Sequence, residues 1–355
     1  MKKIIALLLA CLLLFSLAAC AEQNGGGGEA PSPAASPSGS AEPSPSETPP
    51  ETPEPSPEKT GLSVGFLKGP TGMGAAYFME QVSAGELGDA YDVTLDADPS
   101  AAASALVSGE LDIACLPTNV AVSLYNKTGG KVRVAAINTL GVLYILEKGD
   151  SVKSVSDLAG KTIFATGQGS NPEYVLRYIL SENGLDPDKD VTLEFLASDE
   201  LTTRMAAGDI DICMLPVPAA TTVLVKNKDV REALDLTQEW DAVSRDGSIL
   251  TQGCVAVSEN VTDEQVEEFL AAYKQSADFM TDPDNLDEAA ALAEKHGIVG
   301  AAAIAKAAMS KCGITLITGA DELRELLTGY FSVLYAADPA SVGGSLPDDG
   351  FYWEA

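Results

Sequence analysis

Two glycine-rich loops contain the residues of this sequence that are best suited to hold a small molecule. The candidate ligand-binding residues of the first loop are Gly69, Pro70, Thr71, Gly72 and Met73. Those of the second loop are Gly167, Gln168, Gly169, Ser170 and Asn171. Glycine lets a backbone approach a ligand closely, and free N–H groups at a helix start favour anionic or hydrogen-bond-accepting atoms. Neither loop ends in the Gly-Lys-Ser/Thr of a Walker phosphate loop.

Polar residues that follow predicted strands would complete such a site. They are Thr118, Asn119 and Thr139 in the first half of the chain, and Pro216 and Pro218 in the second half. Ligands of open α/β sheets bind at the carboxyl ends of strands, near helix N-termini. The candidates form a polar but largely uncharged site, with Met73 as an apolar wall. They include no arginine and no paired carboxylates, which argues against acid–base catalysis.

The cysteines and the single histidine do not form a recognisable reactive site. Four cysteines, Cys115, Cys213, Cys254 and Cys312, lie beyond the N-terminal region, and an even set in an exported protein could form disulfides. Three of them fall within apolar, strand-like runs, where free cysteine behaves as a small buried hydrophobe, so we favour reduced thiols. His296 suits a helix C-terminus better than a metal site or a base. No metal site, serine triad or cofactor is predicted.

Alternating strands and helices would position these candidates. Strands are predicted at residues 62–66, 111–116, 132–138, 161–166, 191–195, 210–215 and 252–257. Helices are predicted at residues 74–84, 98–109, 171–182, 198–208, 262–280, 286–296, 300–311 and 321–336. Asn171 and Ser198 are predicted N-caps, and Thr262 with Gln265 resembles a capping box. The alternation predicts an α/β fold with a mostly parallel, buried sheet.

One segment of the chain recurs. Residues 109–117 read Gly-Glu-Leu-Asp-Ile-Ala-Cys-Leu-Pro, and residues 208–216 read Gly-Asp-Ile-Asp-Ile-Cys-Met-Leu-Pro. The glycine, the Asp-Ile pair, the leucine and the proline recur with a constant offset. Two halves built alike predict two similar α/β lobes, although helix-Gly-strand units also recur by chance.

The N-terminal residues predict export. Lys2 and Lys3 precede a short apolar run that ends in Leu17-Ala18-Ala19-Cys20, which is the pattern of a secretory signal and not of a membrane span. The ending resembles a bacterial lipobox, which implies cleavage before Cys20 and its lipidation; the alternative is an ordinary signal peptide with a chance cysteine. Residues 21–60 are rich in Pro, Ser, Glu and Gly and predict a disordered tether, or a low-complexity insert of the same character.

The amino-acid composition limits the kinds of molecule that this protein can bind. The 355 residues carry 52 acidic and 22 basic side chains, a formal net charge of −30 at pH 7. A nucleic-acid partner is therefore not expected, because there is no basic surface to neutralise phosphates. Such a charge mainly keeps a protein soluble.

Beyond these patterns, the chain resembles the type II periplasmic binding proteins, in the branch that binds aliphatic sulfonates and thiamine-pyrimidine precursors. The resemblance rests on the loop at 69–74, on the repeated Gly-x-x-Asp-Ile strand, and on Ser156-Asp157-Leu158-Ala159-Gly160-Lys161-Thr162-Ile163. It covers residues 62 to about 336.

The resemblance implies two Rossmann-like lobes joined by a two-stranded hinge. Lobe 1 would comprise residues 61–140 and 254–355 and lobe 2 residues 141–253, after a signal peptide at 1–19 and a lipidated tether at 20–60. It implies an extracytoplasmic protein, anchored to the cell membrane through Cys20, whose lobes close on a sulfonate, a nitrate-like anion or a thiamine-pyrimidine-like ligand. Its partners would be that ligand and an ABC permease with a cytoplasmic ATPase, and we expect a monomer that is not an enzyme.

Two other functions are compatible with the same fold. One is a surface lipoprotein that senses a ligand without transport, which a neighbouring permease and ATPase in the genome would argue against. The other is an enzyme of the pyrimidine-synthase or menaquinone-pathway kind, which export, a lipid anchor and the near-absence of histidine disfavour.

Overall fold

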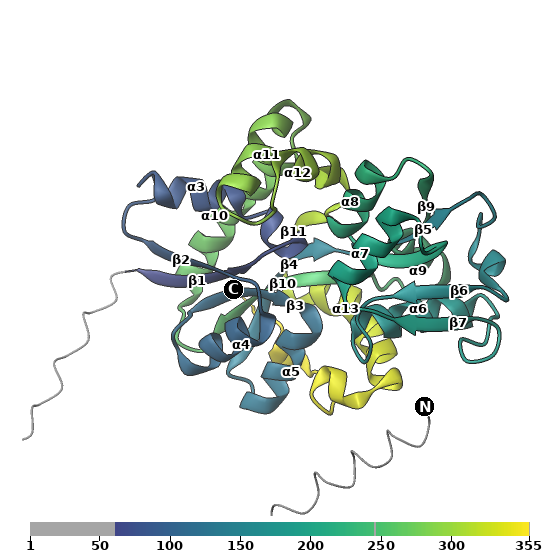
Figure 1. Ribbon diagram of the computed structural model, residues 1–355. Coiled ribbons are helices and arrows are strands. Elements are labelled where there is room, and N and C mark those ends of the chain that lie inside the picture. Colours follow the sequence, from purple (N-terminus) through teal and green to yellow (C-terminus); the bar gives the residue numbers. More distant parts are fainter. Residues whose placement is uncertain (1–60, 245, 355) are drawn as a thin grey trace, which may run out of the picture. The chain divides into compact units, whose positions relative to one another are not determined.

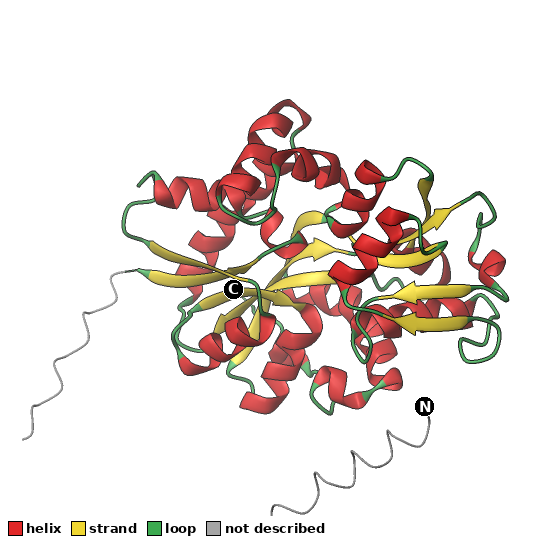
Figure 2. Cartoon of the chain, viewed as in Figure 1, coloured by secondary structure: helices red, strands yellow, loops and turns green. Residues whose placement is uncertain are grey.

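The computed structural model describes residues 61–244 and 246–354. The expected signal peptide, the lipidation site Cys20 and the tether lie outside the described residues. The described chain is of mixed α/β type, with helices on both faces of two sheets (Figures 1 and 2).

The first sheet has six strands in the order β11-β4-β10-β3-β1-β2, and the second has five in the order β7-β6-β8-β5-β9. The strands of the first sheet are β1 (Leu62–Leu67), β2 (Tyr91–Asp96), β3 (Ile113–Pro117), β4 (Val132–Leu140), β10 (Thr251–Ser258) and β11 (Ile314–Thr318). The strands of the second sheet are β5 (Leu143–Lys148), β6 (Thr162–Ala165), β7 (Thr192–Phe195), β8 (Ile212–Pro216) and β9 (Val230–Asp235).

Helices connect these strands. Up to β9 they are α2 (Pro70–Met73), α3 (Ala76–Ser83), α4 (Pro99–Ser108), α5 (Thr118–Thr128), η1 (Val155–Leu158), α6 (Asn171–Glu182), α7 (Ser198–Ala207) and α8 (Ala219–Lys226). After β9 they are α9 (Leu236–Val243), α10 (Asp263–Thr281), η2 (Pro283–Asn285), α11 (Leu286–Lys295), α12 (Ala302–Ala308), η3 (Met309–Lys311), α13 (Ala320–Ala337), η4 (Pro339–Val342) and η5 (Asp349–Phe351). Within the described ranges, no helix combines the length and apolarity that crossing a bilayer requires.

The prediction of a mostly parallel sheet was wrong, because both sheets are mixed. β1 is parallel to β2 and β3, and β6 is parallel to β7 and β8. β10, however, is antiparallel to β3 and β4, and β5 is antiparallel to β8 and β9. β5 and β10 are the strands by which the chain enters one sheet after leaving the other, so they start at the edge where the parallel strands end.

The predicted duplication is present in the fold. Five strands of the first sheet lie in the order β2-β1-β3-β10-β4, and the strands of the second sheet lie in the order β7-β6-β8-β5-β9. Strands at the same place in the two orders also run in the same direction relative to their neighbours. α4 and α7 end at Gly109 and Gly208, whose φ angles of 82° and 81° place both in the left-handed region. This conformation suits glycine, which has no Cβ, and lets the chain turn from helix into strand.

The core follows the alternation of side chains along each strand. In the first sheet, Val64, Phe66 and Val255 point to the face covered by α3 and α10. Leu116 and Cys254 belong to the opposite layer, a cluster that also contains residues of α13 and of the second sheet. The apolar interior therefore continues from one sheet to the other.

Several sequence predictions can now be checked. Thr262 and Gln265 form the predicted capping box of α10, and His296 is the C-cap of α11, as expected. The N-cap assignments of Asn171 and Ser198 were wrong, because Ser170 and Ala197 hold the extended N-cap conformation and both predicted residues are already helical.

The thiols and the strands that the sequence did not predict complete the comparison. The four cysteines named above are free and buried, which confirms the preference for reduced thiols. Burial raises the pKa of Cys213, Cys254 and Cys312 to about 12. The strands β2, β5, β9 and β11 were not predicted. For β11 the reason is that the sequence after residue 258 was taken to be mostly helical.

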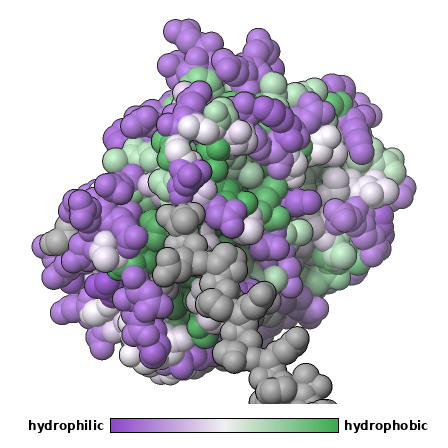
Figure 3. All heavy atoms as spheres, turned by 90° about the vertical axis from the view of Figure 1, so that its left-hand side faces the viewer, coloured by the Kyte–Doolittle hydropathy of each residue, from purple (hydrophilic) through white to green (hydrophobic). Residues whose placement is uncertain are grey.

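Figure 3 faces the end of the molecule that carries β1 and β2. Polar side chains cover most of the face that the grey atoms leave visible, with smaller apolar patches between them. This agrees with the strongly acidic composition of the chain.

Candidate functional site

The carboxyl ends of the parallel strands of both sheets meet where the chain crosses between the sheets. β4 ends at Leu140 and β5 begins at Leu143, so two residues separate the sheets along the chain. Leu143 pairs with Pro216 at the end of β8, while Gly253 pairs with Pro117 at the end of β3 and with Thr139 near the end of β4. All predicted ligand-binding residues lie at these strand ends or in the loops and helix starts that follow them.

Three buried threonines form a hydrogen-bonded chain at the first sheet. Thr118 opens α5 directly after β3, Thr251 opens β10, and each is at most 2 % exposed. The Thr251 hydroxyl donates to the Thr139 carbonyl oxygen at 3.0 Å and lies 3.2 Å from the Thr118 hydroxyl, which must then act as the donor to Thr251. The fully buried Thr118 side chain also contacts the thiol of Cys254 on β10.

Asn138 connects these three hydrogen-bonded threonines to the first glycine-rich loop. Its side-chain amide accepts from the Thr139 hydroxyl at 3.2 Å and donates to the Tyr273 hydroxyl at 3.2 Å and, at 3.5 Å, to the Thr71 carbonyl oxygen. A Cβ at Gly253 would lie 2.8 Å from both Asn138 Oδ1 and Thr71 Cγ2, so glycine is required there for the loop to pack against the strands.

The first loop itself is held tightly. Gly69 has a φ of 87°, and its N–H donates to the Ile298 carbonyl oxygen at 3.1 Å. A Cβ at Gly72 would lie 2.1 Å from the Leu67 carbonyl oxygen, which excludes any larger residue. Met73 is fully buried in a cluster with residues of α11, α12 and the second sheet.

The second loop is more open. Gly167 and Gly169 have φ angles of 81° and 67°, and the Ser170 hydroxyl donates to the Gly167 carbonyl oxygen at 2.7 Å. The Gly169 N–H donates to Glu173 Oε2 at 2.8 Å, which ties the loop to α6. Gln168 and Gly169 are exposed, whereas Asn171 is buried.

Asn171 brings the second loop into contact with α13. Its side-chain nitrogen donates to the Tyr330 hydroxyl at 2.8 Å, whereas its buried Oδ1 has no hydrogen-bond partner among the described residues. Burial raises the pKa of Tyr330 above its ordinary value of 10, so the phenol stays neutral. A buried amide oxygen without a partner costs about 1–3 kcal/mol, and a ligand could recover that free energy by supplying the missing contact.

One charged contact also spans the two sheets. The Lys311 ammonium group of η3, which precedes β11 of the first sheet, forms an ion pair with Glu232 of β9. It also lies 5.3 Å from the ring centre of Tyr144 on β5. Such a contact between the sheets would favour the arrangement in which they lie close together.

The sequence identified some of these residues and missed others. The predicted Thr71, Thr118 and Thr139 are joined to one another through Asn138 and Thr251, whereas Asn171 lies against Tyr330. Asn119, Pro216 and Pro218 are half-buried at the same strand ends. Tyr273 and Tyr330 were missed, because each lies within a long amphipathic helix where the sequence pattern indicates only packing.

Comparison with known proteins places this site in context. Residues 77–308 match the family described as "ABC transporter, phosphonate, periplasmic substrate-binding protein". The crystal structure of an ABC transporter from Parabacteroides distasonis superposes with a TM-score of 0.69 at 25 % identity, covering 83 % of this chain and 99 % of that one.

Two sulfonate-binding proteins share the fold. The periplasmic aliphatic sulphonate binding protein from Escherichia coli gives a TM-score of 0.64 at 16 % identity, covering 84 % of this chain and 93 % of its own. The alkanesulfonate-binding protein from Xanthomonas axonopodis pv. citri bound to MOPS gives 0.60 at 16 % identity, covering 84 % and 100 %. The family match spans well over half of the chain, and the chain therefore belongs to the periplasmic substrate-binding proteins of phosphonate-type ABC transporters.

Proposed function

We propose that this substrate-binding protein captures a small molecule between two lobes and delivers it to an ABC permease with a cytoplasmic ATPase. Lobe 1 comprises residues 61–140 and 254–355, and lobe 2 comprises residues 141–253. The strand pairings support this division, because β5 to β9 form one sheet and the remaining strands form the other. The chain passes between them after β4 and before β10, which gives two connections about which the lobes can rotate.

The ligand-binding residues are proposed from both lobes. Lobe 1 contributes Gly69, Pro70, Thr71, Gly72, Met73, Thr118, Asn119 and Thr139. Lobe 2 contributes Gly167, Gln168, Gly169, Ser170, Asn171, Pro216 and Pro218. The observation that supports this site best is the buried, unpartnered Oδ1 of Asn171 at the junction of the lobes.

The ligand is proposed to be a sulfonate, a nitrate-like anion or a thiamine-pyrimidine-like molecule, and the family adds phosphonates as a class to be tested. The Asn171 side chain can form a hydrogen bond either with an anionic ligand or with a ligand that carries an N–H or O–H donor. If its amide group turns over, the oxygen accepts from the Tyr330 hydroxyl and the nitrogen is free to donate to an anion; unturned, the oxygen accepts from a ligand N–H or O–H. Backbone N–H groups at the starts of α5 and α6 could add further donors.

The remaining parts of the proposal concern location and assembly. Cys20 would carry the lipid that anchors the protein to the membrane, and residues 21–60 would tether the lobes to it. We propose a monomer without catalytic activity, consistent with a family of transport proteins.

A thermal-shift screen of residues 21–355 against sulfonates, phosphonates, nitrate, pyrimidines and related heterocycles tests the proposal. A ligand at about 100 times its dissociation constant should add about 2.7 kcal/mol, which raises the melting temperature by several degrees. Asn171→Ala and Thr71→Ala should abolish the shift. Thr203→Ala, at an exposed position on α7, should keep it.

Two results would count against the proposal. One is a folded protein that no compound in the panel stabilises. The other is a stabilising compound whose effect survives both Asn171→Ala and Thr71→Ala, which would place its binding elsewhere on the molecule.

A further inference from the structure

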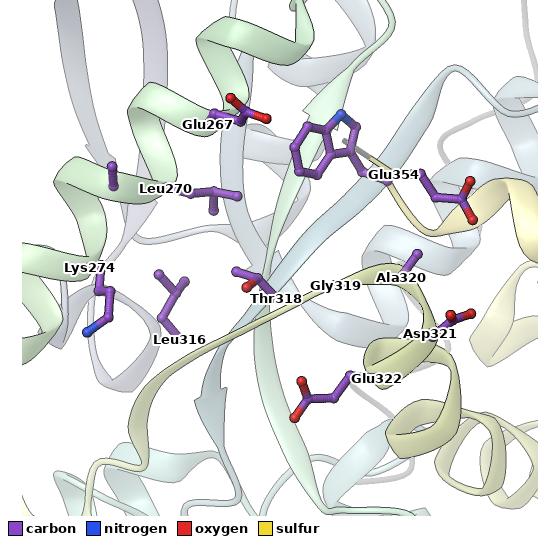
Figure 4. A pocket seen from close by; sticks show the side chains of 12 residues that line it. Glu267, Leu270, Lys274, Leu316, Thr318, Gly319, Ala320, Asp321, Glu322 and Glu354 are labelled. Atoms are coloured by element: carbon purple, nitrogen blue, oxygen red, sulfur yellow. The ribbon is translucent and has the colours of Figure 1, made fainter.

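One hollow of the molecule is lined by none of the candidate ligand-binding residues. It has a volume of about 870 Å³ and lies between α10, β11 and the start of α13 (Figure 4). Its apolar lining includes Leu270 of α10, Leu316 of β11 and Trp353 near the C-terminus. The Trp353 indole is 6 % exposed and donates to Asp263 Oδ1 at 2.9 Å, so this wall is fixed in place.

The strand that borders this groove is an edge strand. β11 is last in the order of the first sheet and pairs only with β4, with Ile314 opposite Thr139 and Thr318 opposite Ala136. Its residues 314–317 are half-exposed and Thr318 is exposed. The outer side of an edge strand presents backbone donors and acceptors, which an additional extended segment can pair with.

The same flank of the sheet already accepts one extended segment. Beyond the end of β11, Tyr352 forms a parallel bridge with Val134 of β4. The Trp353 N–H donates to the Val134 carbonyl oxygen at 2.8 Å. The C-terminal segment thus takes the position beside β4 that β11 leaves open beyond Thr318.

Carboxylates surround the apolar lining. Figure 4 shows Glu267, Asp321, Glu322 and Glu354 around the hollow. Arg324 forms ion pairs with Asp321 at 2.5 Å and with Glu354 at 4.0 Å. Among the described residues, no ion pair involves Glu267 or Glu322.

The lysine of the groove does not balance these charges. Lys274 pairs with Asp278 of its own helix at 2.7 Å. The groove thus combines an apolar floor, the open edge of a strand and an uncompensated negative charge. Because of this charge, it would attract basic side chains.

From these features we propose that the groove binds an extended, basic segment of a partner protein, which adds to the outer edge of β11. Its apolar side chains would contact Leu270 and Leu316, and its lysine or arginine side chains would pair with Glu267 and Glu322. Charge disfavours two other occupants. A second copy carries the same net charge of −30, and residues 21–60 of the chain itself hold seven glutamates and one lysine.

The test uses the full-length chain in detergent and a short fluorescent peptide of alternating lysine and valine. Fluorescence anisotropy should detect binding of this peptide, and the same peptide with glutamate in place of lysine should not bind. The double variant Glu267→Lys, Glu322→Lys should weaken binding about ten-fold or more, because both ion pairs with the peptide are lost and replaced by repulsion. The control Glu288→Lys, Glu294→Lys makes the same charge change at exposed positions on α11 and should bind like the wild type.

Hydrogen exchange separates strand addition from loose charge attraction. Bound peptide should slow exchange of amides in residues 314–318. Equal weakening by the groove and control variants, or binding without protection of β11, would overturn the proposal. So would absence of peptide binding, or self-association of the wild-type chain through this edge; the carboxylates would then serve only to keep the edge strand unpaired.

Discussion

Glu147, at the end of the second-sheet strand β5, is a buried carboxylate whose contacts link β5, the loop that follows it and β9. It accepts from the Ser151 and Val152 backbone N–H groups at 2.8 and 3.1 Å, and it pairs with Arg231 of β9 at 2.5 Å. Burial raises the pKa of Glu147, but these hydrogen bonds together outweigh it and hold the pKa below its ordinary value of 4.5. A lowered folded-state pKa stabilises the fold at neutral pH, and this stabilisation is lost as the pH falls through the folded-state value.

Glu147→Gln should therefore lower the free energy of unfolding at pH 7 by about 1–3 kcal/mol, because charge-assisted hydrogen bonds become neutral ones. The difference in free energy of unfolding between wild type and variant should shrink as the pH falls below 4.5. Urea unfolding at a series of pH values measures this difference, and Glu194→Gln, at an exposed position of β7, is the control. A gap that widens in acid would contradict this assignment.

At the same scale, the sequence could identify loop residues of the site but not the helical residues that contact them. Glycine and polar residues after strands have a local signature, so Thr71, Thr118 and Asn171 were found. Asn171 and Tyr330 are 159 residues apart, and only the packing of α13 against α6 brings them within hydrogen-bond distance. No local pattern in α13 distinguishes Tyr330 from an ordinary core tyrosine.

At the scale of elements, the repeated helix-Gly-strand unit was the most informative sequence feature. It predicted α4 with β3 and α7 with β8, and both copies end their helix on a left-handed glycine. Strand direction could not be predicted this way. β5 and β10 are antiparallel because of where the chain crosses between sheets, which is a property of the topology and not of their residues.

Gly109→Ala should lower the free energy of unfolding by about 1–2 kcal/mol, because an L-residue is strained at its φ of 82° although nothing lies within 4 Å of the added Cβ. Gly300→Ala is the matched control, since Gly300 has the same open space without a positive φ. Urea denaturation of both variants gives the comparison. Equal stability of the two would mean that the helix ends in some other conformation.

At the scale of the whole molecule, the proposed function depends on two lobes that close on a ligand. The apolar interior is continuous across both sheets, and Lys311, which precedes β11 of the first sheet, pairs with Glu232 of the second sheet. We expect a ligand to shift the equilibrium from the open to the closed arrangement by contacting both proposed lobes at once. The two glycine-rich loops, one after β1 and one after β6, are the segments proposed to do so.

The most direct test of this account is hydrogen exchange with and without a ligand found in the thermal-shift screen. Binding should slow exchange in residues 69–73 and 167–171 together, and Asn171→Ala should abolish protection of both segments. Protection of only one of them, or of a region away from both, would contradict the claim that the ligand is held between the two lobes.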